Sequence, residues 1–269
     1  MIEEPKPLTI KKNWKRPSKE QIQAFKNMPS GFVTDALDGK GALSLDIKPI
    51  GDGRDINCVV VGAAVTAGNN AADIMGTLAA LNFIQENDIL VVSVSKHQGC
   101  AAAGDRVMGM LKNCGGAGFV TDGPMRDYAG LIEVGLPAWC TGLTPASPFT
   151  KGPATVGLPI NIGGQKVESG DIVVADMDGV VVVPHRKIDF VITRLSQVAN
   201  LEHSLDAEVR EGLKIPDAVR DMILEDNIKF DRSRLASSNA ELVTKLTDIM
   251  PSHNRHPASP AEARAILNL

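Results

Sequence analysis

The spacing of hydrophobic and polar positions changes several times along the chain, and each change predicts a different element. Residues 58–66 are apolar and rich in β-branched side chains, which predicts a buried strand, and apolar positions recur at helical spacing in residues 70–85. We expect the alternation to continue with a strand at 88–94, a helix at 104–111, a strand at 117–121, a helix at 126–134 and a strand at 137–143. Strands that alternate with short helices predict parallel βαβ units and an α/β fold.

Residues 156–184 break this rhythm. Short apolar segments at 156–162, 165–167, 172–175 and 180–184 are separated by Gly-Gly, Ser-Gly and Asp-Gly turns, which predicts a β-rich layer beside the α/β layer. The valines at 180–183 have no polar residue between them, so we expect both faces of that strand to be buried.

Helical patterns flank these two layers. One begins near Ser18, and another follows Ser30, which we expect to cap a helix over 31–37. A long amphipathic helix is predicted from 186 to about Glu211, where Gly212 ends it, and further helices are expected from Pro216, at 239–250 and at 260–267. We therefore divide the chain into a polar leader (1–20), a main domain (21–215) and a helical C-terminal extension (216–269).

The predicted leader carries a basic cluster that has two interpretations. Glu3, Glu4 and Glu20 dilute the positive charge, so we favour a solvated segment over a nucleic-acid-binding arm. The formal net charge of the 269 residues is −4, which gives no overall basic footprint, and no nucleic-acid partner is expected. The basic residues of the cluster are Lys11, Lys12, Lys15, Arg16 and Lys19.

The composition is that of an ordinary globular protein. Hydrophobic residues make up 43% of the chain and charged residues 22%, which excludes disorder as the main state. No signal peptide is recognisable and the apolar runs are too short to span a bilayer, so we expect a cytoplasmic protein with no membrane partner. The cysteines form no CxxC pair and are expected to be buried free thiols: Cys58, Cys100, Cys114 and Cys140.

Several motifs that form catalytic or ligand-binding sites in other proteins are either absent here or lie in predicted elements that do not fit the motif. No GxGxxG follows a predicted strand, and no GxxxxGK, HExxH or GxSxG is present. Ser93 and Lys96 match SxxK at a strand end, where the lysine does not stack over the serine. His253 and His256 have metal-ligand spacing, but their segment predicts a polar loop. We interpret the remaining histidines and an Asp-Gly turn as structural: His97, His185, His203, Asp176 and Asp178.

One predicted strand end carries charges of both signs. Residues 121–127, TDGPMRD, follow a parallel strand and open a helix, and open α/β sheets place their sites at such carboxyl ends. Arg126 can hold an anion there while Asp127 holds a cation; the alternative is an N-cap aspartate beside a solvent-exposed arginine. Upstream, the small side chains of residues 99–105, GCAAAGD, allow backbone N–H groups to approach a carboxylate. The two strands are consecutive in the chain, and if they are also neighbours in the sheet, these two segments lie together and form one pocket.

In combination these motifs resemble the RraA-like family, which includes class II 4-hydroxy-4-methyl-2-oxoglutarate/4-carboxy-4-hydroxy-2-oxoadipate aldolases. The resemblance covers about residues 25–215 and depends on GDIVVADMDGVVVVP at 170–184, VTDGPMRD at 120–127 and GLPAWCTGLTP at 135–145. It also depends on the twenty residues that separate Asp105 from the Arg126-Asp127 pair. The resemblance implies a swivelling β/β/α layered catalytic domain over residues 21–215.

The resemblance also implies substrate-binding residues. The backbone amides of one segment are expected to hold the carboxylate of a pyruvoyl group, and Arg126 is expected to contact its keto oxygen. That segment consists of Gly104, Asp105, Arg106 and Val107.

A metal site follows from the same resemblance. Asp127 matches the one direct protein ligand of a Mg²⁺ or Mn²⁺ ion, which Asp105 reaches through water. An acid from a neighbouring subunit has no secure match, although Glu208 and Glu211 are candidates. Family members assemble as trimers or pairs of trimers with the site at a subunit boundary, so we expect a homo-oligomer.

The implied activity is cleavage of a C–C bond in a 2-oxo acid through a pyruvate enolate, with Arg126 and Asp105 as catalytic residues. Oxaloacetate decarboxylation needs the same enolate. The alternative is a non-catalytic regulator that binds ribonuclease E, as the family's namesake does; in that type the aspartate after the arginine is replaced, whereas Asp127 is present here. Arg106 and the long tail beyond 215 depart from the family pattern and leave the substrate open.

Overall fold

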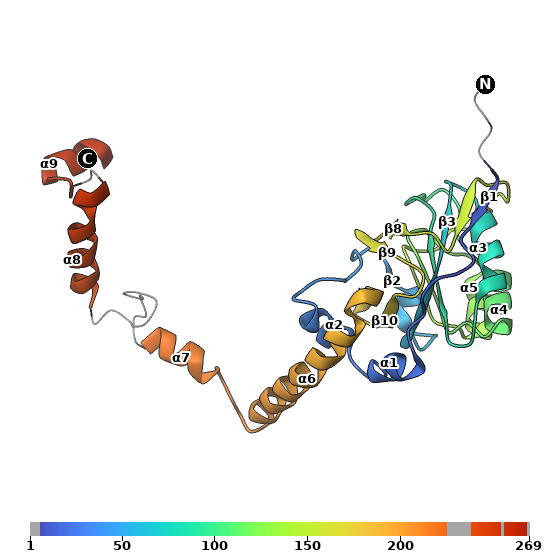
Figure 1. Ribbon diagram of the computed structural model, residues 1–269, viewed down its shortest axis with the longest axis horizontal. Helices are drawn as coiled ribbons and strands as arrows, with labels where there is room; N and C mark the ends of the chain where they lie inside the picture. Colours follow the sequence, from blue (N-terminus) through green and yellow to red (C-terminus); the bar gives the residue numbers. More distant parts are fainter. Residues whose placement is uncertain (1–5, 225–237, 254–255, 268–269) are drawn as a thin grey trace. The chain divides into compact units, whose positions relative to one another are not determined.

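The structure of this protein is a computed structural model in which residues 6–224, 238–253 and 256–267 are described. In these residues nine strands form one mixed sheet, and two more form a separate hairpin (Figure 1). The strands are β1 (Leu8–Ile10), β2 (Lys48–Pro49), β3 (Val60–Asn69), β4 (Ile89–Ser93), β5 (Gly118–Thr121), β6 (Ala138–Cys140), β7 (Ala154–Val156), β8 (Ile160–Ile162), β9 (Gln165–Val167), β10 (Ile172–Asp176) and β11 (Gly179–Val183). The α-helices are α1 (Lys19–Ala24), α2 (Ser30–Ala36), α3 (Met75–Ala80), α4 (Asp105–Asn113), α5 (Tyr128–Val134), α6 (Ile188–Arg210), α7 (Asp217–Leu224), α8 (Asn239–Ile249) and α9 (Pro260–Leu267).

The centre of the sheet confirms the predicted βαβ units. Strands β3, β4, β5 and β6 are parallel neighbours in that order, and α3, α4 and α5 connect them. The helix predicted over 70–85 is shorter, because α3 begins only at Met75, whose backbone N–H donates to the Asp73 carboxylate at 2.8 Å. Four 3₁₀ segments complete the described elements: Ile50–Gly53, Leu81–Phe83, His185–Lys187 and Met250–His253.

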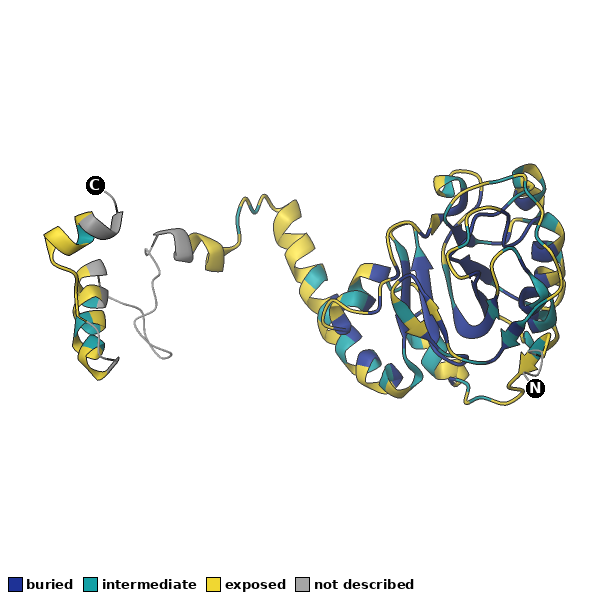
Figure 2. Ribbon diagram, turned by 90° about the horizontal axis from the view of Figure 1, so that it is seen from above, coloured by how far each residue is buried: buried dark blue, intermediate teal, exposed yellow. Residues whose placement is uncertain are grey.

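The β-rich layer joins the sheet through the long strand β3. The first half of β3 pairs with β10, which forms an antiparallel hairpin with β11, and its second half pairs with β4. Val180 and Val182 pack into the larger core, whereas Val181 and Val183 pack with α1, α2 and α6. Both faces of this strand are therefore buried, as the unbroken run of valines predicts. Figure 2 shows that the inner strands of the sheet are largely buried, whereas the helices expose one side.

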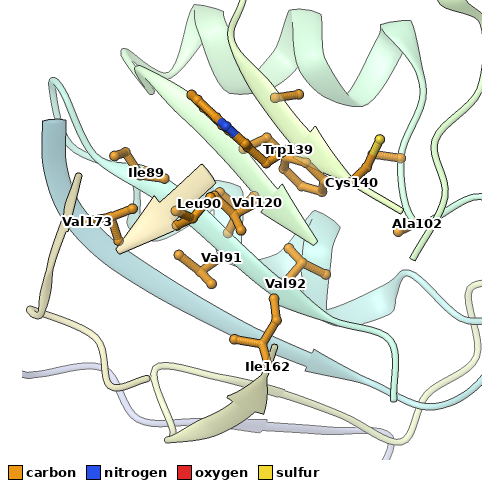
Figure 3. Packing of buried hydrophobic residues seen from close by; sticks show 14 of the residues in the cluster. Ile89, Leu90, Val91, Val92, Ala102, Val120, Trp139, Cys140, Ile162 and Val173 are labelled. Carbon is orange, nitrogen blue, oxygen red and sulfur yellow. The ribbon is translucent and has the colours of Figure 1, made fainter. Parts of the chain in front are cut away.

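The larger core lies along β4. Residues 89–92 are fully buried and pack with Val120 of β5 and the indole of Trp139 on β6 (Figure 3). The nearly continuous burial of β4 reflects its central place in a parallel sheet, where neither face meets water. This core fixes the positions of the carboxyl ends of β4 and β5.

Two predictions about local structure are wrong. Residues 156–162 do not form one strand, because β7 ends at Val156, in antiparallel pairing with β3, and β8 starts at Ile160, in a hairpin with β9. Ser30 does not cap α2 from outside the helix; it is the first helical residue, and its hydroxyl and backbone N–H both donate to Asp176 at 2.7 Å. This contact confirms the structural interpretation of Asp176.

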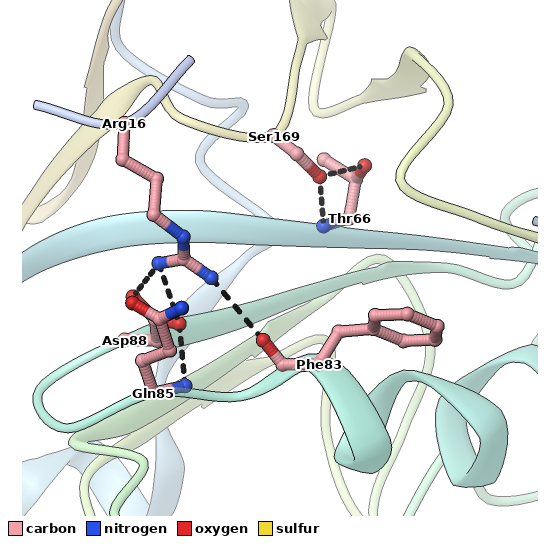
Figure 4. Close-up of polar contacts among 6 residues, drawn as sticks. All are labelled: Arg16, Thr66, Phe83, Gln85, Asp88 and Ser169. Atoms are coloured by element: carbon pink, nitrogen blue, oxygen red, sulfur yellow. Dashed lines mark hydrogen bonds and ion pairs between the residues drawn. The ribbon is translucent and has the colours of Figure 1, made fainter. Parts of the chain in front are cut away.

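The described part of the predicted leader, residues 6–20, is mostly exposed, but two of its contacts attach it to the fold. Strand β1 pairs in parallel with β7, and the guanidinium of Arg16 donates to both carboxylate oxygens of Asp88 at 2.7 and 2.9 Å (Figure 4). The Asp88 side chain is only 4% exposed. Burial raises the pKa of Asp88 while the contact with Arg16 lowers it, so the arginine stabilises a carboxylate that water does not reach. The basic cluster is thus partly structural.

Contacts between residues divide the chain into residues 1–203 and residues 204–269, and each unit is described separately. Helix α6 spans residues 188–210, close to the predicted helix, and α7, α8 and α9 confirm the helical patterns predicted for the tail. No helix among the described residues is long and apolar enough to cross a membrane.

Candidate active site

The carboxyl ends of β4 and β5 meet, as the order of motifs along the chain predicts. The backbone N–H of Ala102 donates to Pro124 at 2.7 Å, and that of Arg126 donates to Ala103 at 3.1 Å. These bonds join the small-residue loop that follows β4 to the loop that follows β5. Since β4 and β5 are parallel neighbours, both loops lie at the same edge of the sheet.

All six residues named for the site from the sequence line one small pocket at this edge. The pocket has a volume of about 40 Å³, and Ile74, Ala103 and Pro148 complete its lining. The six are Gly104, Asp105, Arg106, Val107, Arg126 and Asp127. The structure therefore brings them together, while their individual roles stay predictions.

Asp127 does not behave as an ordinary helix cap. It precedes α5 in the left-handed conformation, with φ 61° and ψ 47°, and its side chain makes no capping hydrogen bond. One carboxylate oxygen, Oδ2, instead lies 3.1 Å from Nε of Arg126, and the two side chains are 44% and 32% exposed. A left-handed non-glycine residue is uncommon and concentrates at functional sites. The carboxylate thus lines the pocket and contacts Arg126 rather than the helix end.

Arg126 has a second partner that the sequence did not indicate. Its Nη1 donates to the hydroxyl of Ser147, which belongs to the loop between β6 and β7. The buried carboxylate of Asp73 holds this loop by accepting hydrogen bonds from the backbone of Lys151 at 2.6 Å and of Gly152 at 3.0 Å. The guanidinium is thus oriented from two sides. A proline-rich segment after a strand was the only local signal for this loop, and it does not specify a partner.

The first turn of α4 contributes the third part of the site. Gly104 is the N-cap, and Asp105 accepts a hydrogen bond from the backbone of Arg106 at 2.6 Å. A Cβ atom on Gly104 would lie 2.6 Å from Oδ2 of Asp127, and one on Gly130 would lie 2.5 Å from Oδ2 of Asp105. A side chain at either glycine would therefore displace one of the two carboxylates. The N-terminal N–H groups of α4 and its dipole favour an anion here.

The carboxylates present fit a hard divalent cation that keeps most of its water. Among the described residues no group of three or more His, Cys, Asp or Glu side chains could hold a metal ion. The pocket offers the carboxylates of Asp127 and Asp105 alone, both in contact with solvent. Mg²⁺ dehydrates reluctantly and is commonly bound through one or two carboxylates with water and substrate, so this donor set suits it.

The other chemical candidates have different outcomes. The hydroxyl of Ser93 donates to the buried carboxylate of Asp122 at 3.0 Å, and Lys96 is exposed, which gives the SxxK pattern a structural explanation. All four cysteines are free, but Cys114 is exposed, so the expectation of four buried thiols is wrong there. His256 lies 3.8 Å from Glu262, and the side chain of His253 lies outside the described residues.

The chain has an α/β fold, and a pocket lined by both cationic and anionic side chains lies at the carboxyl ends of its parallel strands β4 and β5. The chain belongs to the RraA-like family, because the family model described as Aldolase/RraA matches residues 32–182. A second model, beta-keto acid cleavage enzyme, matches only the C-terminal segment 224–269.

Individual relatives agree with this membership. A Halalkalibacterium halodurans protein named "Putative 4-hydroxy-4-methyl-2-oxoglutarate aldolase" is 34% identical over 190 residues, which cover 71% of this chain and 86% of the relative. Legionella pneumophila "Protein DlpA" is 26% identical over 212 residues, which cover 76% of this chain but only 34% of DlpA.

Solved structures confirm the fold. Streptomyces coelicolor RraAS2, described as an unusual member of the RNase ES inhibitor RraA protein family, aligns with a TM-score of 0.60 and 28% identity over 72% of this chain and 100% of that chain. An uncharacterized Pseudomonas syringae protein aligns with a TM-score of 0.66 and 22% identity over 75% of this chain and 93% of that chain. The second similarity concerns the fold alone.

Proposed function

We propose that this protein is an aldolase-type lyase that cleaves a C–C bond of a 2-oxo acid through a pyruvate enolate, of the 4-hydroxy-4-methyl-2-oxoglutarate type. The observation that carries the proposal is the shared pocket, in which Arg126, Asp127 and the first turn of α4 meet. The aldolase name of the relative from Halalkalibacterium halodurans supports it. Oxaloacetate decarboxylation would use the same enolate.

In the proposed reaction, backbone N–H groups of residues 104–107, at the start of α4, bind the carboxylate of the 2-oxo acid, and the N–H of Arg106 exchanges its contact with Asp105 for the substrate. A water molecule oriented by Asp105 removes the proton of the C4 hydroxyl group, the C4 oxygen forms the keto group of the second product, and the C3–C4 bond breaks. The electron pair of that bond forms the enolate of pyruvate, whose oxyanion the guanidinium of Arg126 stabilises. Protonation of C3 then gives pyruvate.

Asp127 would hold the divalent cation, Mg²⁺ or Mn²⁺, and Asp105 would hold it through water. When bound, the cation supplies Lewis acidity at the keto oxygen. The left-handed backbone of Asp127 and its contact with Arg126 keep this carboxylate at the pocket rather than at the helix end. Arg126 positions substrate oxygens beside it.

We further propose that a second copy of the chain completes the site in a homo-oligomer. A volume of about 40 Å³ encloses too little space for a whole substrate of this class, whereas ligand pockets usually measure several hundred Å³. Glu208, in the last turn of α6, and Glu211, just after that helix, are both exposed and stay candidates for an acid donated by a neighbouring subunit.

The test is pyruvate release from 4-hydroxy-4-methyl-2-oxoglutarate and from oxaloacetate, with Mg²⁺ and then with EDTA. Release that disappears with EDTA supports the proposal. No release from either substrate by folded protein with Mg²⁺ contradicts it and directs attention to the regulator alternative, which the similarity to RraAS2 keeps open. Binding to ribonuclease E would then be measured directly.

A further inference from the structure

A second pocket, which we call the basic pocket, shares no lining residue with the candidate active site. Its volume is about 500 Å³, within the usual range for small-ligand sites. Four cationic side chains line it, together with two carboxylates. The cations are Lys11, Lys15, Lys166 and Arg186, and the carboxylates are Glu168 and Asp171.

Positive charge is in excess in the basic pocket. Glu168 pairs with Lys166 at 2.7 Å, and Asp171 accepts backbone hydrogen bonds from Glu168 and His185, each at 2.8 Å. The hydrogen bond from Lys166 lowers the pKa of Glu168, and the charges of Lys11 and Arg186 lower it further, so three cations surround one carboxylate. The two carboxylates therefore leave about two positive charges without an opposite charge in the pocket.

Two nitrogen atoms on lining residues have no hydrogen-bond partner in the described part of the chain. They are Nε1 of Trp14 and Nε2 of His185, and both are shielded from bulk water. An unpaired buried polar group costs about 1–3 kcal/mol, and native proteins usually satisfy such groups. The indole nitrogen can only donate, so its missing partner is an acceptor. Water does not reach this N–H, but the indole lines the cation-rich pocket, so its signal is sensitive to an anion that binds there.

The walls of the basic pocket are held in place before any ligand arrives. The backbone N–H of Lys11 donates to Val156 at 2.9 Å, and Arg16, two residues after Trp14, is fixed by Asp88. Ser169 accepts a hydrogen bond from the backbone of Thr66 at 2.9 Å, and this contact joins the other wall to β3 (Figure 4). Binding to such a preformed site costs little ordering of the chain.

We propose that the basic pocket binds a small, multiply charged oxyanion, with Arg186, Lys11 and Lys15 as charge partners, and that the Trp14 indole in the pocket wall responds to its binding. Phosphates and polycarboxylates both fit this description, because each presents several charged oxygen acceptors to the guanidinium of an arginine and to the ammonium groups of lysines. The basic cluster of the N-terminal segment thereby has a ligand-binding role in addition to its structural one.

The two tryptophans of the chain make a direct test possible. The ¹⁵N–¹H signal of the Trp14 indole is followed in the full-length protein during titration with inorganic phosphate, with citrate, and with sodium chloride at matched ionic strength. The Trp139 indole, which donates to the carbonyl of Asp176 at 2.9 Å in the core, is the internal control. Comparison with Trp14→Phe assigns the signals.

A saturable shift of the Trp14 signal alone, with phosphate or citrate but not with chloride, supports the proposal and shows which oxyanion the site prefers. Arg186→Gln and Lys15→Gln should each weaken binding about tenfold, as loss of a charge-assisted contact typically does, whereas Lys26→Gln on an exposed surface outside the pocket should not. A Trp14 signal that stays fixed, or that moves equally with chloride, overturns the proposal. The wild-type titration decides this even if a variant does not fold.

Discussion

Replacement of Asp127 by asparagine removes the negative charge of the candidate metal ligand while it keeps the shape of the side chain and the conformation of the backbone. Asparagine has the same shape and, with aspartate, best tolerates the left-handed conformation found there, with φ 61°. Asp127→Ala would remove the charge and also add about 1–2 kcal/mol of backbone strain, so the effect of the lost charge could not be separated from that of the strain. The conservative substitution is therefore the informative one.

The effect of Asp127→Asn on stability should be small. The substitution removes one ion pair, that with Arg126 at 3.1 Å, between side chains that are 44% and 32% exposed. Exposed pairs of this kind contribute about 0–1 kcal/mol, so the urea midpoint should change little. Glu133→Gln, an exposed carboxylate on the same helix α5, is the matched control for loss of one negative charge.

The effect on activity should be large if Asp127 is the direct metal ligand. Loss of a residue that merely orients a ligand typically costs about 10–100-fold, so loss of the ligand itself should lower kcat/KM by at least about 10²-fold, or about 2.7 kcal/mol. Pyruvate release is measured at increasing Mg²⁺, and part of the loss should be recovered at high metal. An unchanged kcat/KM with unchanged Mg²⁺ dependence would refute the assignment.

Three further substitutions or reactions test other parts of the structure. Gly104→Ala should abolish most of the pyruvate release without unfolding the protein, because its Cβ would lie 2.6 Å from the Asp127 carboxylate. The control is Gly109→Ala inside α4, where a Cβ has no neighbour within 3.8 Å; it should retain activity and raise the stability by about 0.5–1 kcal/mol. Equal activities of the two variants would show that a Cβ at residue 104 does not disturb the carboxylate. Iodoacetamide at pH 8, followed by mass spectrometry, should modify the exposed Cys114 first and Cys140 last, since burial raises the pKa of the Cys140 thiol to about 11; early labelling of Cys140 would contradict its burial. Arg16→Gln should destabilise the protein by about 1–3 kcal/mol at pH 7 in urea unfolding. Burial already raises the pKa of Asp88, and without Arg16 this pKa should rise further. The loss of stability should therefore be full above the pKa of Asp88 in the folded variant, and it should shrink as the pH falls and the carboxyl group is protonated. A loss of stability that does not depend on pH would show that the charge of Asp88 is not its cause.

The order of elements was available from the sequence because it depends on local pattern. Hydrophobic period distinguishes the parallel strands from the helices that connect them, and the unbroken valines at 180–183 required burial on both faces. The meeting of residues 99–105 with residues 121–127 followed as well, since the ends of consecutive parallel strands lie at one edge when the strands are neighbours. The six site residues themselves were named from the resemblance to the RraA-like family, whereas the strand order explains why they lie in one pocket.

Contacts between distant segments were decided only by the tertiary structure. Arg16 and Asp88 are 72 residues apart, and nothing in the local pattern of either predicts the ion pair that attaches the N-terminal segment to the fold. The orientation of Arg126 by Ser147 belongs to the same class, because a loop of irregular backbone has no period from which its partner follows. Local sequence sets what a segment can form, whereas the partner of a side chain depends on where the packed core brings the rest of the chain.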